Sequence, residues 1–203
     1  MRLQLKHIIF AFLLVGVFGK SEAQLLDSLR LFYEEEFYDL EYAKNNAEKV
    51  FKLSLRRQKL TKVPDAINGF YRLQQLDLSR NKITTLPDSL FSLKYLQRID
   101  LTNTKITVLP AKIGNLTNLV HLIINGTNVN KLPPEIGKLK NLMILEIAGT
   151  QIYDLPKEIS KCTKLRRVDM RSIELSDYEA TLLRDLLPEG CELLYTPDCN
   201  CRK

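Results

Sequence analysis

The stretch LQRIDLTNTKITVLPAKIGNLTN, residues 96–118, decides the fold together with the stretch that follows it, LVHLIINGTNVNKLPPEIGKLKN, residues 119–141. Both are 23 residues long, and they align without a gap. Each opens on leucine and contains a Leu-Pro pair, followed by isoleucine and then leucine at three-residue steps. Self-similarity at a short fixed period is the sequence signature of a repeat protein, in which stacked copies share one core.

The same period runs outward from these two copies and covers residues 50–172. The apolar residues that open successive copies are Val50, Leu73, Leu96, Leu119, Leu142 and Leu165. The prolines that recur at the same interval, five of the eight in the chain, are Pro64, Pro87, Pro110, Pro133 and Pro156. The chain therefore carries five full copies and a partial sixth, which begins at Leu165 and lacks the Leu-Pro pair.

Each copy contains two local patterns. Apolar and polar residues alternate in segments such as Leu76-Asp77-Leu78, which predicts a short strand. The Pro-x-x-Ile-x-x-Leu segment has a spacing of three, which suits a single helical or 3-10 turn with proline at its start. One copy cannot bury its own apolar face, so we expect the copies to stack and to join their strands into a parallel sheet.

Written as one pattern, each copy reads L-x-x-L-x-L-x-x-(N/T/Q)-x-L-x-x-L-P-x-x-I-x-x-L-x-x. This pattern resembles the leucine-rich repeat family in its 23-residue form, and the chain resembles short exported bacterial members of that family. The resemblance implies an α/β fold, a right-handed solenoid whose parallel sheet lines the concave side. One column departs from the family, whose asparagine is present here only as Asn81. The residues at the equivalent positions are Gln58, Thr104, Thr127 and Thr150.

The solenoid needs a cover at its N-terminal end, because its first repeat would otherwise expose apolar surface. Apolar residues at three- and four-residue steps predict a helix over residues 25–40, within a helical cap at 24–49. These residues are Leu25, Leu29, Phe32, Tyr33, Phe37 and Leu40. An aromatic stripe of this kind also suits a partner-binding face, but we favour the cap.

Residues 173–203 predict a C-terminal cap and tail. Ser176-Asp177 is a helix start signal, and Pro188-Glu189-Gly190 ends the helix after about Leu187. Cys191 to Tyr195 then predicts a last short strand. The leucines expected to face inward from the helix are Leu182, Leu183, Leu186 and Leu187.

Residues 1–23 predict a secretory signal peptide. Basic residues precede an apolar run of 11 residues, 8–18, and small residues follow at Ser21 and Ala23. This arrangement predicts cleavage between Ala23 and Gln24. An apolar run of that length is too short to span a bilayer as a helix. We therefore expect an exported protein with no membrane span, either secreted or placed in the periplasm or cell envelope.

The four cysteines are Cys162, Cys191, Cys199 and Cys201. Cys162 stands in a column otherwise filled by leucine and phenylalanine, which favours a small buried apolar residue. In an exported protein, a disulfide from Cys191 to Cys199 or Cys201 would fix the tail to the last strand. The cysteines are too few, and too far from His121, to predict a metal site.

The composition offers little material for catalysis. Beyond the signal segment His121 is the sole histidine, and the eight glycines are scattered, so no catalytic triad and no phosphate-binding loop can be assembled. Four carboxylates do share one strand column, but we expect that column to be polar because it faces solvent. They are Asp77, Asp100, Glu146 and Asp169. We therefore predict neither an enzyme nor a cofactor.

Strand residues on the concave face are the candidate binding residues. In the fourth and fifth repeats this face carries isoleucines that we expect to be exposed, with polar neighbours around them. An apolar centre inside a polar rim is the usual arrangement of a protein-binding hot spot, so we expect a protein partner here. The predicted site consists of Val120, His121, Ile123, Asn125, Met143, Ile144 and Glu146.

A second surface is basic, and it offers an alternative. Without residues 1–23 the net charge falls from +6 to +4, a mild excess that does not indicate nucleic-acid binding. The first repeats nevertheless concentrate Lys52, Arg56, Arg57 and Arg80, which suit an anionic lipid or glycan of the cell envelope. We expect a monomer. Asn115 and Asn125 begin N-glycosylation sequons, which matter only in a eukaryotic secretory pathway.

Overall fold

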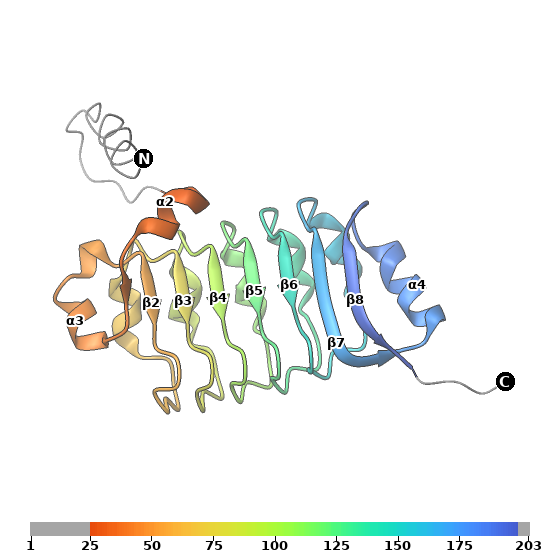
Figure 1. Ribbon diagram of the computed structural model, residues 1–203, viewed down its shortest axis with the longest axis horizontal. Helices are drawn as coiled ribbons and strands as arrows, with labels where there is room; N and C mark the ends of the chain where they lie inside the picture. The colour runs from red at the N-terminus through yellow and green to blue at the C-terminus, as the bar shows by residue number, and fades with distance from the viewer. Residues whose placement is uncertain (1–24, 199–203) are drawn as a thin grey trace, which may run out of the picture.

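The computed structural model describes residues 25–198, and it contains one sheet of eight parallel strands in chain order (Figure 1). Residues 23 apart in sequence lie opposite one another, so that Arg98 pairs with Gln75 on one side and with His121 on the other. The repeat period thus sets the register, and the predicted parallel sheet is confirmed. The strands are β1 (Glu36–Phe37), β2 (Lys52–Ser54), β3 (Gln75–Asp77), β4 (Arg98–Asp100), β5 (His121–Ile123), β6 (Ile144–Glu146), β7 (Arg167–Leu175) and β8 (Glu192–Pro197).

Five 3-10 helices follow strands β2 to β6 and lie behind the sheet in Figure 1. A proline in extended conformation stands immediately before each of them, as predicted from the Leu-Pro pairs. We call the sheet face turned away from these helices the concave face. The helices are η2 (Asp65–Gly69), η3 (Asp88–Ser92), η4 (Ala111–Asn115), η5 (Pro134–Lys138) and η6 (Lys157–Lys161).

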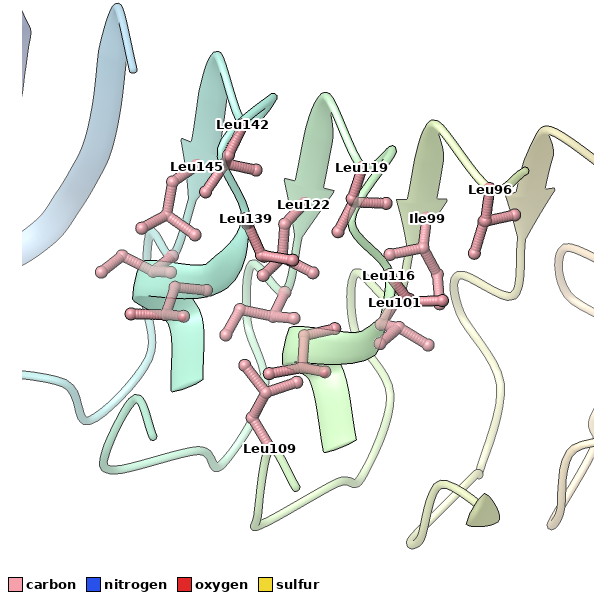
Figure 2. Close-up of a cluster of buried hydrophobic side chains, with 14 of the residues drawn as sticks. Leu96, Ile99, Leu101, Leu109, Leu116, Leu119, Leu122, Leu139, Leu142 and Leu145 are labelled. Atoms are coloured by element: carbon pink, nitrogen blue, oxygen red, sulfur yellow. The ribbon is translucent and has the colours of Figure 1, made fainter. Parts of the chain in front are cut away.

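The core lies between the strands and the 3-10 helices and is a ladder of leucine and isoleucine side chains (Figure 2). Leu122 and Leu145 point into it from neighbouring strands, and each is 0% exposed. Leu116 and Leu139 meet them from the segments that follow η4 and η5. Because every repeat contributes the same positions, the core is continuous along the array.

The column after each strand holds buried polar side chains that bond to the backbone. The Asn81 amide donates to the carbonyl oxygens of Leu55 and Leu78, at 2.8 Å each, and therefore joins two repeats. The Thr104 hydroxyl donates to the Leu101 carbonyl at 2.8 Å, within its own repeat. Threonine thus supplies a hydrogen bond to a backbone carbonyl of the turn, as expected. Its bond stays within one repeat, whereas the asparagine amide links two. Thr127 and Thr150 repeat the threonine arrangement.

The N-terminal cap differs from the prediction of one helix over residues 25–40. It has two short helices, α2 (Ser28–Tyr33) and α3 (Leu40–Lys44), with strand β1 between them and the 3-10 helix η1 (Ala47–Lys49) after them. The chain breaks here because β1 pairs with β2 and buries Phe37, and because the Asp39 carboxylate accepts from the Tyr42 amide and so caps the start of α3.

The prediction that the apolar residues of this cap pack against the first repeat is therefore wrong for four of the six. Phe37 is buried and Leu40 is half-buried, but Leu25, Leu29, Phe32 and Tyr33 are exposed. Leu31, outside the predicted stripe, is 2% exposed and packs inward instead.

The C-terminal cap is a helix followed by a strand, as predicted. Helix α4 (Asp177–Leu186) begins at Ser176, whose hydroxyl and the Glu179 carboxylate form a capping box. Leu183 and Leu187 are buried and Leu186 is half-buried, whereas Leu182 is 48% exposed and was wrongly placed in the core. Strand β8 pairs with β7 and extends two residues beyond the predicted end, to Pro197.

Cys162 is fully buried, as predicted, and burial raises the pKa of its thiol to about 11. Cys191 is half-buried, while Cys199 and Cys201 lie outside the described residues together with the predicted signal segment 1–23. Across residues 25–198, none of the helices has the length and apolar character needed to cross a membrane.

Candidate functional site

All seven residues of the predicted protein-binding site come together on or beside the neighbouring strands β5 and β6. His121 pairs in register with Ile144, and Ile123 pairs with Glu146. Because successive strand residues point to opposite faces, His121 and Ile123 share the concave face, whereas Leu122 points into the core. Val120 and Met143 stand immediately before the two strands, and Asn125 follows β5.

Ile123 is 3% exposed, and the expectation that it is an exposed apolar residue is therefore wrong. It does not join the main core cluster, which takes its neighbours Leu122 and Ile124. Its cover is polar, because the Glu146 carboxylate reaches from β6 to His121 and Asn125, the residues on either side of Ile123. The apolar side chain is thus enclosed beneath a hydrogen-bonded layer on the concave face.

That layer is a chain of side-chain hydrogen bonds across three strands. The Arg98 guanidinium meets His121 Nδ1, and His121 Nε2 lies 2.7 Å from Glu146 Oε1. Asn125 Nδ2 donates to Glu146 Oε2 at 2.7 Å, and Asn125 Oδ1 accepts from the Ala148 amide at 2.7 Å. A guanidinium can only donate, so His121 accepts at Nδ1 and carries its proton on Nε2, which donates to Glu146.

The network favours a neutral imidazole. Burial is the largest cause that lowers the pKa of His121 below its usual value, and the positive charge of Arg98 lowers it further. Glu146 and Asp100 act in the opposite direction but do not outweigh these effects. At neutral pH the network is therefore complete without a proton on Nδ1. Asn125 uses both ends of its amide here, so the sequon asparagine is already engaged.

A strip of apolar side chains lies beside this network, at the start of the strands. Met143 is 40% exposed, and Val120 and Ile144 are half-buried. The amides of Met143 and Ile144 both bond to the Val120 carbonyl, at 2.8 and 3.1 Å, so the three residues are held side by side. We call these three residues, together with Arg98, His121, Asn125 and Glu146, the central concave surface.

Two glutamines, not recognised as functional from the sequence, explain why this apolar strip is uncovered. Gln74 and Gln97 occupy the same column as Val120 and Met143, in the two repeats that precede the repeat of Val120. Gln74 Oε1 accepts from the Leu26 amide at 2.9 Å, and Gln97 Nε2 donates to the Leu26 carbonyl at 2.6 Å. The N-terminal segment therefore crosses the second and third repeats, where the column is polar. The sequence does carry a signal for this difference, because the column that holds Gln74 and Gln97 changes to the apolar Val120 and Met143 in the next two repeats.

The shared column of carboxylates is structural. Asp77 accepts from the Ser79 amide at 2.8 Å, and Asp100 accepts from the Thr102 amide at 2.9 Å. Asp169 is 4% exposed, contrary to the expectation of a solvent-facing column, and it binds the Arg171 guanidinium at 2.6 Å. Burial opposes its ionisation, but the bonds and charge of Arg171 outweigh burial and lower its pKa. Residues 25–198 contain no cluster of side chains suited to holding a metal ion.

The basic patch is only partly as predicted. Lys52 is half-buried, and its ammonium donates to the Phe32 carbonyl at 3.2 Å, so it serves the N-terminal cap. Arg56, Arg57 and Arg80 are exposed at the end of the strands. Arg57 and Arg80 have left-handed backbone conformations, with φ of 59° and 56°.

Two family models match the chain: "leucine-rich repeat region" over residues 89–187 and "leucine rich repeat" over residues 48–106. Together they cover every repeat identified from the sequence. The chain belongs to the leucine-rich repeat family. Neither model describes a catalytic family, in agreement with the structural role of the carboxylate column.

Several solved structures share the fold of this leucine-rich repeat protein. A leucine-rich repeat protein of Leptospira interrogans is 25% identical over 80% of this chain and 55% of its own, with a TM-score of 0.51. An internalin of Listeria monocytogenes is 19% identical over 82% of this chain and 53% of its own, with a TM-score of 0.61. The chain thus spans about half the length of either bacterial relative.

The leucine-rich repeat ectodomain of the receptor kinase GASSHO1/SCHENGEN3 of Arabidopsis thaliana is 28% identical. The similarity covers 79% of this chain and 20% of that chain, with a TM-score of 0.59, and that structure is a complex with CASPARIAN STRIP INTEGRITY FACTOR 2. No curated relative matches the chain by sequence.

Proposed function

We propose that this leucine-rich repeat protein is an exported interaction module that binds a protein partner on the central concave surface. The observation that carries the proposal is the uncovered apolar strip of Val120, Met143 and Ile144 beside hydrogen-bonding groups that the network already holds in place. Apolar contact area next to fixed polar groups is the composition of a binding hot spot. The buried Ile123 supports this surface from below instead of touching the partner.

The rigidity of the surface favours binding. His121, Asn125 and Glu146 hold one another through bonds of 2.7 Å, so they lose little conformational freedom when a partner arrives. Binding therefore avoids much of the entropy cost of ordering side chains at an interface. The plant ectodomain in complex with its factor supports a macromolecular ligand for this repeat architecture.

Export is part of the proposal. It rests on the apolar run and small residues of segment 1–23 and on the similarity of the repeats to internalins. Intact-mass measurement of protein from the culture supernatant or periplasm is expected to give a chain that begins at Gln24. An exported chain that retained Met1 would contradict the signal peptide.

Affinity capture from the native cell envelope and secretome tests the binding surface. We expect Met143→Asp to abolish capture of the partner while the melting temperature stays nearly unchanged, because Met143 is 40% exposed. The matched control is Val108→Asp, since Val108 is 65% exposed and lies in the segment that leads to η4. If the Met143→Asp variant still captured the partner and the Val108→Asp variant did not, this placement of the binding surface would be wrong.

A further inference from the structure

A second surface lies where the strands of the first three repeats end, along the lower left edge of the sheet in Figure 1, coloured orange to yellow-green. Segments 56–64, 79–87 and 102–110 contain seven basic residues and no aspartate or glutamate. The equivalent segments of the next two repeats, 125–133 and 148–156, contain one lysine and one aspartate. The basic residues are Arg56, Arg57, Lys59, Lys62, Arg80, Lys82 and Lys105, all of them exposed.

Three of these lysines belong to a motif, Lys-x-Thr, that occurs once in each of the three repeats. Its copies are Lys59-Leu60-Thr61, Lys82-Ile83-Thr84 and Lys105-Ile106-Thr107. The middle residue turns inward: Ile83 and Ile106 are 0% exposed and Leu60 is half-buried. The lysine and threonine on either side are exposed in every copy. We call these three lysines and three threonines the Lys-x-Thr array.

Backbone hydrogen bonds fix the spacing of the array. The Lys82 amide donates to the Leu60 carbonyl at 2.7 Å, and the Lys105 amide donates to the Ile83 carbonyl at 2.8 Å. The lysines and threonines therefore follow one another from repeat to repeat along this edge, although Lys59 has a left-handed backbone with a φ of 58°. The array thus places one exposed lysine and one exposed threonine on each of three successive repeats.

The positive charge of this edge has no compensation within residues 25–198, because none of its seven basic residues forms an ion pair there. Like charges on neighbouring rungs repel one another and destabilise the fold. Arg57 and Arg80 add strain, since they hold left-handed conformations at positions where the fourth and fifth repeats have Gly126 and Gly149. A bound polyanion would relieve this repulsion, although it would leave the backbone conformations of Arg57 and Arg80 unchanged.

The side chains of this edge select among polyanions. Segments 56–64, 79–87 and 102–110 contain no aromatic residue. The exposed Tyr38 lies beside the first of them, because Gln58 Nε2 donates to its carbonyl at 2.9 Å, but one ring is not the row of aromatic side chains on which successive bases stack. Val108 alone among the large apolar residues of these segments is strongly exposed, which gives neither a hot spot for a protein nor a group that inserts into a membrane. The row of threonine hydroxyls instead offers donors and acceptors to a ligand that is itself rich in hydroxyl groups.

We propose that the Lys-x-Thr array, with Arg56, Arg57 and Arg80 beside it, binds a linear acidic polysaccharide. Carboxylate or sulfate groups of the polymer contact the lysines and arginines, and sugar hydroxyls bond to the threonines. This site is separate from the central concave surface, because it lies beyond the strand ends of the first three repeats and not on strands β5 and β6. Its failure would leave the protein-binding proposal intact.

Binding of defined polymers to the purified protein tests the proposal. Dextran sulfate and polygalacturonate are expected to bind, whereas neutral dextran is not. The triple variant Lys59→Gln/Lys82→Gln/Lys105→Gln is expected to lower the affinity at least tenfold and to weaken its dependence on salt. The matched control, Lys138→Gln/Lys157→Gln/Lys161→Gln, removes the same charge from exposed lysines of η5 and η6 and is expected to keep the affinity.

A second variant separates a sugar site from simple attraction between charges. Thr61→Val/Thr84→Val/Thr107→Val keeps the shape and the charge but removes the hydroxyl row, and we expect it to weaken polygalacturonate binding several-fold. Equal loss in the lysine control variant would show that net charge alone is responsible and would overturn the proposal. Tighter binding of oligodeoxythymidylate or polyglutamate than of either acidic polysaccharide would overturn it as well. Circular dichroism melting confirms that each variant is folded.

Discussion

The two halves of the repeat array share one core but present different surfaces. In the first half, Gln74 and Gln97 hold the N-terminal segment at the start of the strands, and exposed basic residues follow the strand ends. In the second half the half-buried Val120 and the exposed Met143 stand immediately before the strands, and the segments that follow the strands are nearly neutral. Since the leucine ladder is the same in both halves, the columns outside the core decide what each half can bind.

The largest expected effect tests the shared core. Leu76→Ala in the first half and Leu122→Ala in the second each remove a buried side chain from equivalent positions, so each is expected to cost about 2–5 kcal/mol of unfolding free energy. Urea denaturation measures both. A large loss for one variant and a negligible loss for the other would show that the halves do not share an equivalent core.

A smaller effect is expected from the polar layer that Arg98, His121, Asn125 and Glu146 form across strands β4 to β6. Glu146→Ala leaves His121 Nε2 and Asn125 Nδ2 without their acceptor and uncovers Ile123, so we expect a loss of about 1–3 kcal/mol. The control is Glu174→Ala, an exposed carboxylate on β7, for which a change within about 0.5 kcal/mol is expected. Equal effects of the two changes would mean that the network does not stabilise the concave face.

The same layer predicts a dependence on pH. The pKa of His121 is lowered in the folded protein, so the unfolded chain binds a proton more readily. The stability that follows from the neutral imidazole is therefore complete above the unfolded pKa of about 6.5 and declines as the pH falls through it. Thermal melts from pH 8 to 5 are expected to show this decline in the native protein and not in His121→Gln. A parallel decline in the variant would assign it to other groups.

The smallest expected effect has the opposite sign and belongs to the first half. Arg57→Gly and Arg80→Gly relieve left-handed backbone strain, so each is expected to stabilise the fold by up to about 1 kcal/mol. The same changes remove cations beside the Lys-x-Thr array and are expected to weaken polygalacturonate binding. Stabilisation without weaker binding would remove the two arginines from the proposed polysaccharide site.

The period of 23 residues was sufficient to predict the register, the 3-10 turns and the leucine ladder, because equivalent residues of a solenoid occupy equivalent places. The same logic failed at Ile123. Its column faces away from the core, but its burial depends on where the neighbouring Glu146 carboxylate lies, which no column pattern specifies.

The N-terminal cap was harder to predict because it lies outside the repeats. Its apolar residues fit a helical spacing, yet Phe37 adds a strand to the sheet edge and thereby divides the expected helix. At the C-terminal end, Ser176 and Glu179 form a local capping signal, so the start of helix α4 was predictable from sequence. Residues close in sequence determine where α4 starts, whereas the N-terminal cap depends on the pairing of β1 with β2, which is more distant in sequence.

Hydrogen–deuterium exchange of the protein with and without its captured partner tests the central claim most directly. We expect protection on binding to be confined to residues 120–125 and 143–148, on and beside strands β5 and β6, with little change at 56–64 and 79–87. Protection confined to those basic segments, or to the 3-10 helices behind the sheet, would contradict a partner site on the central concave surface.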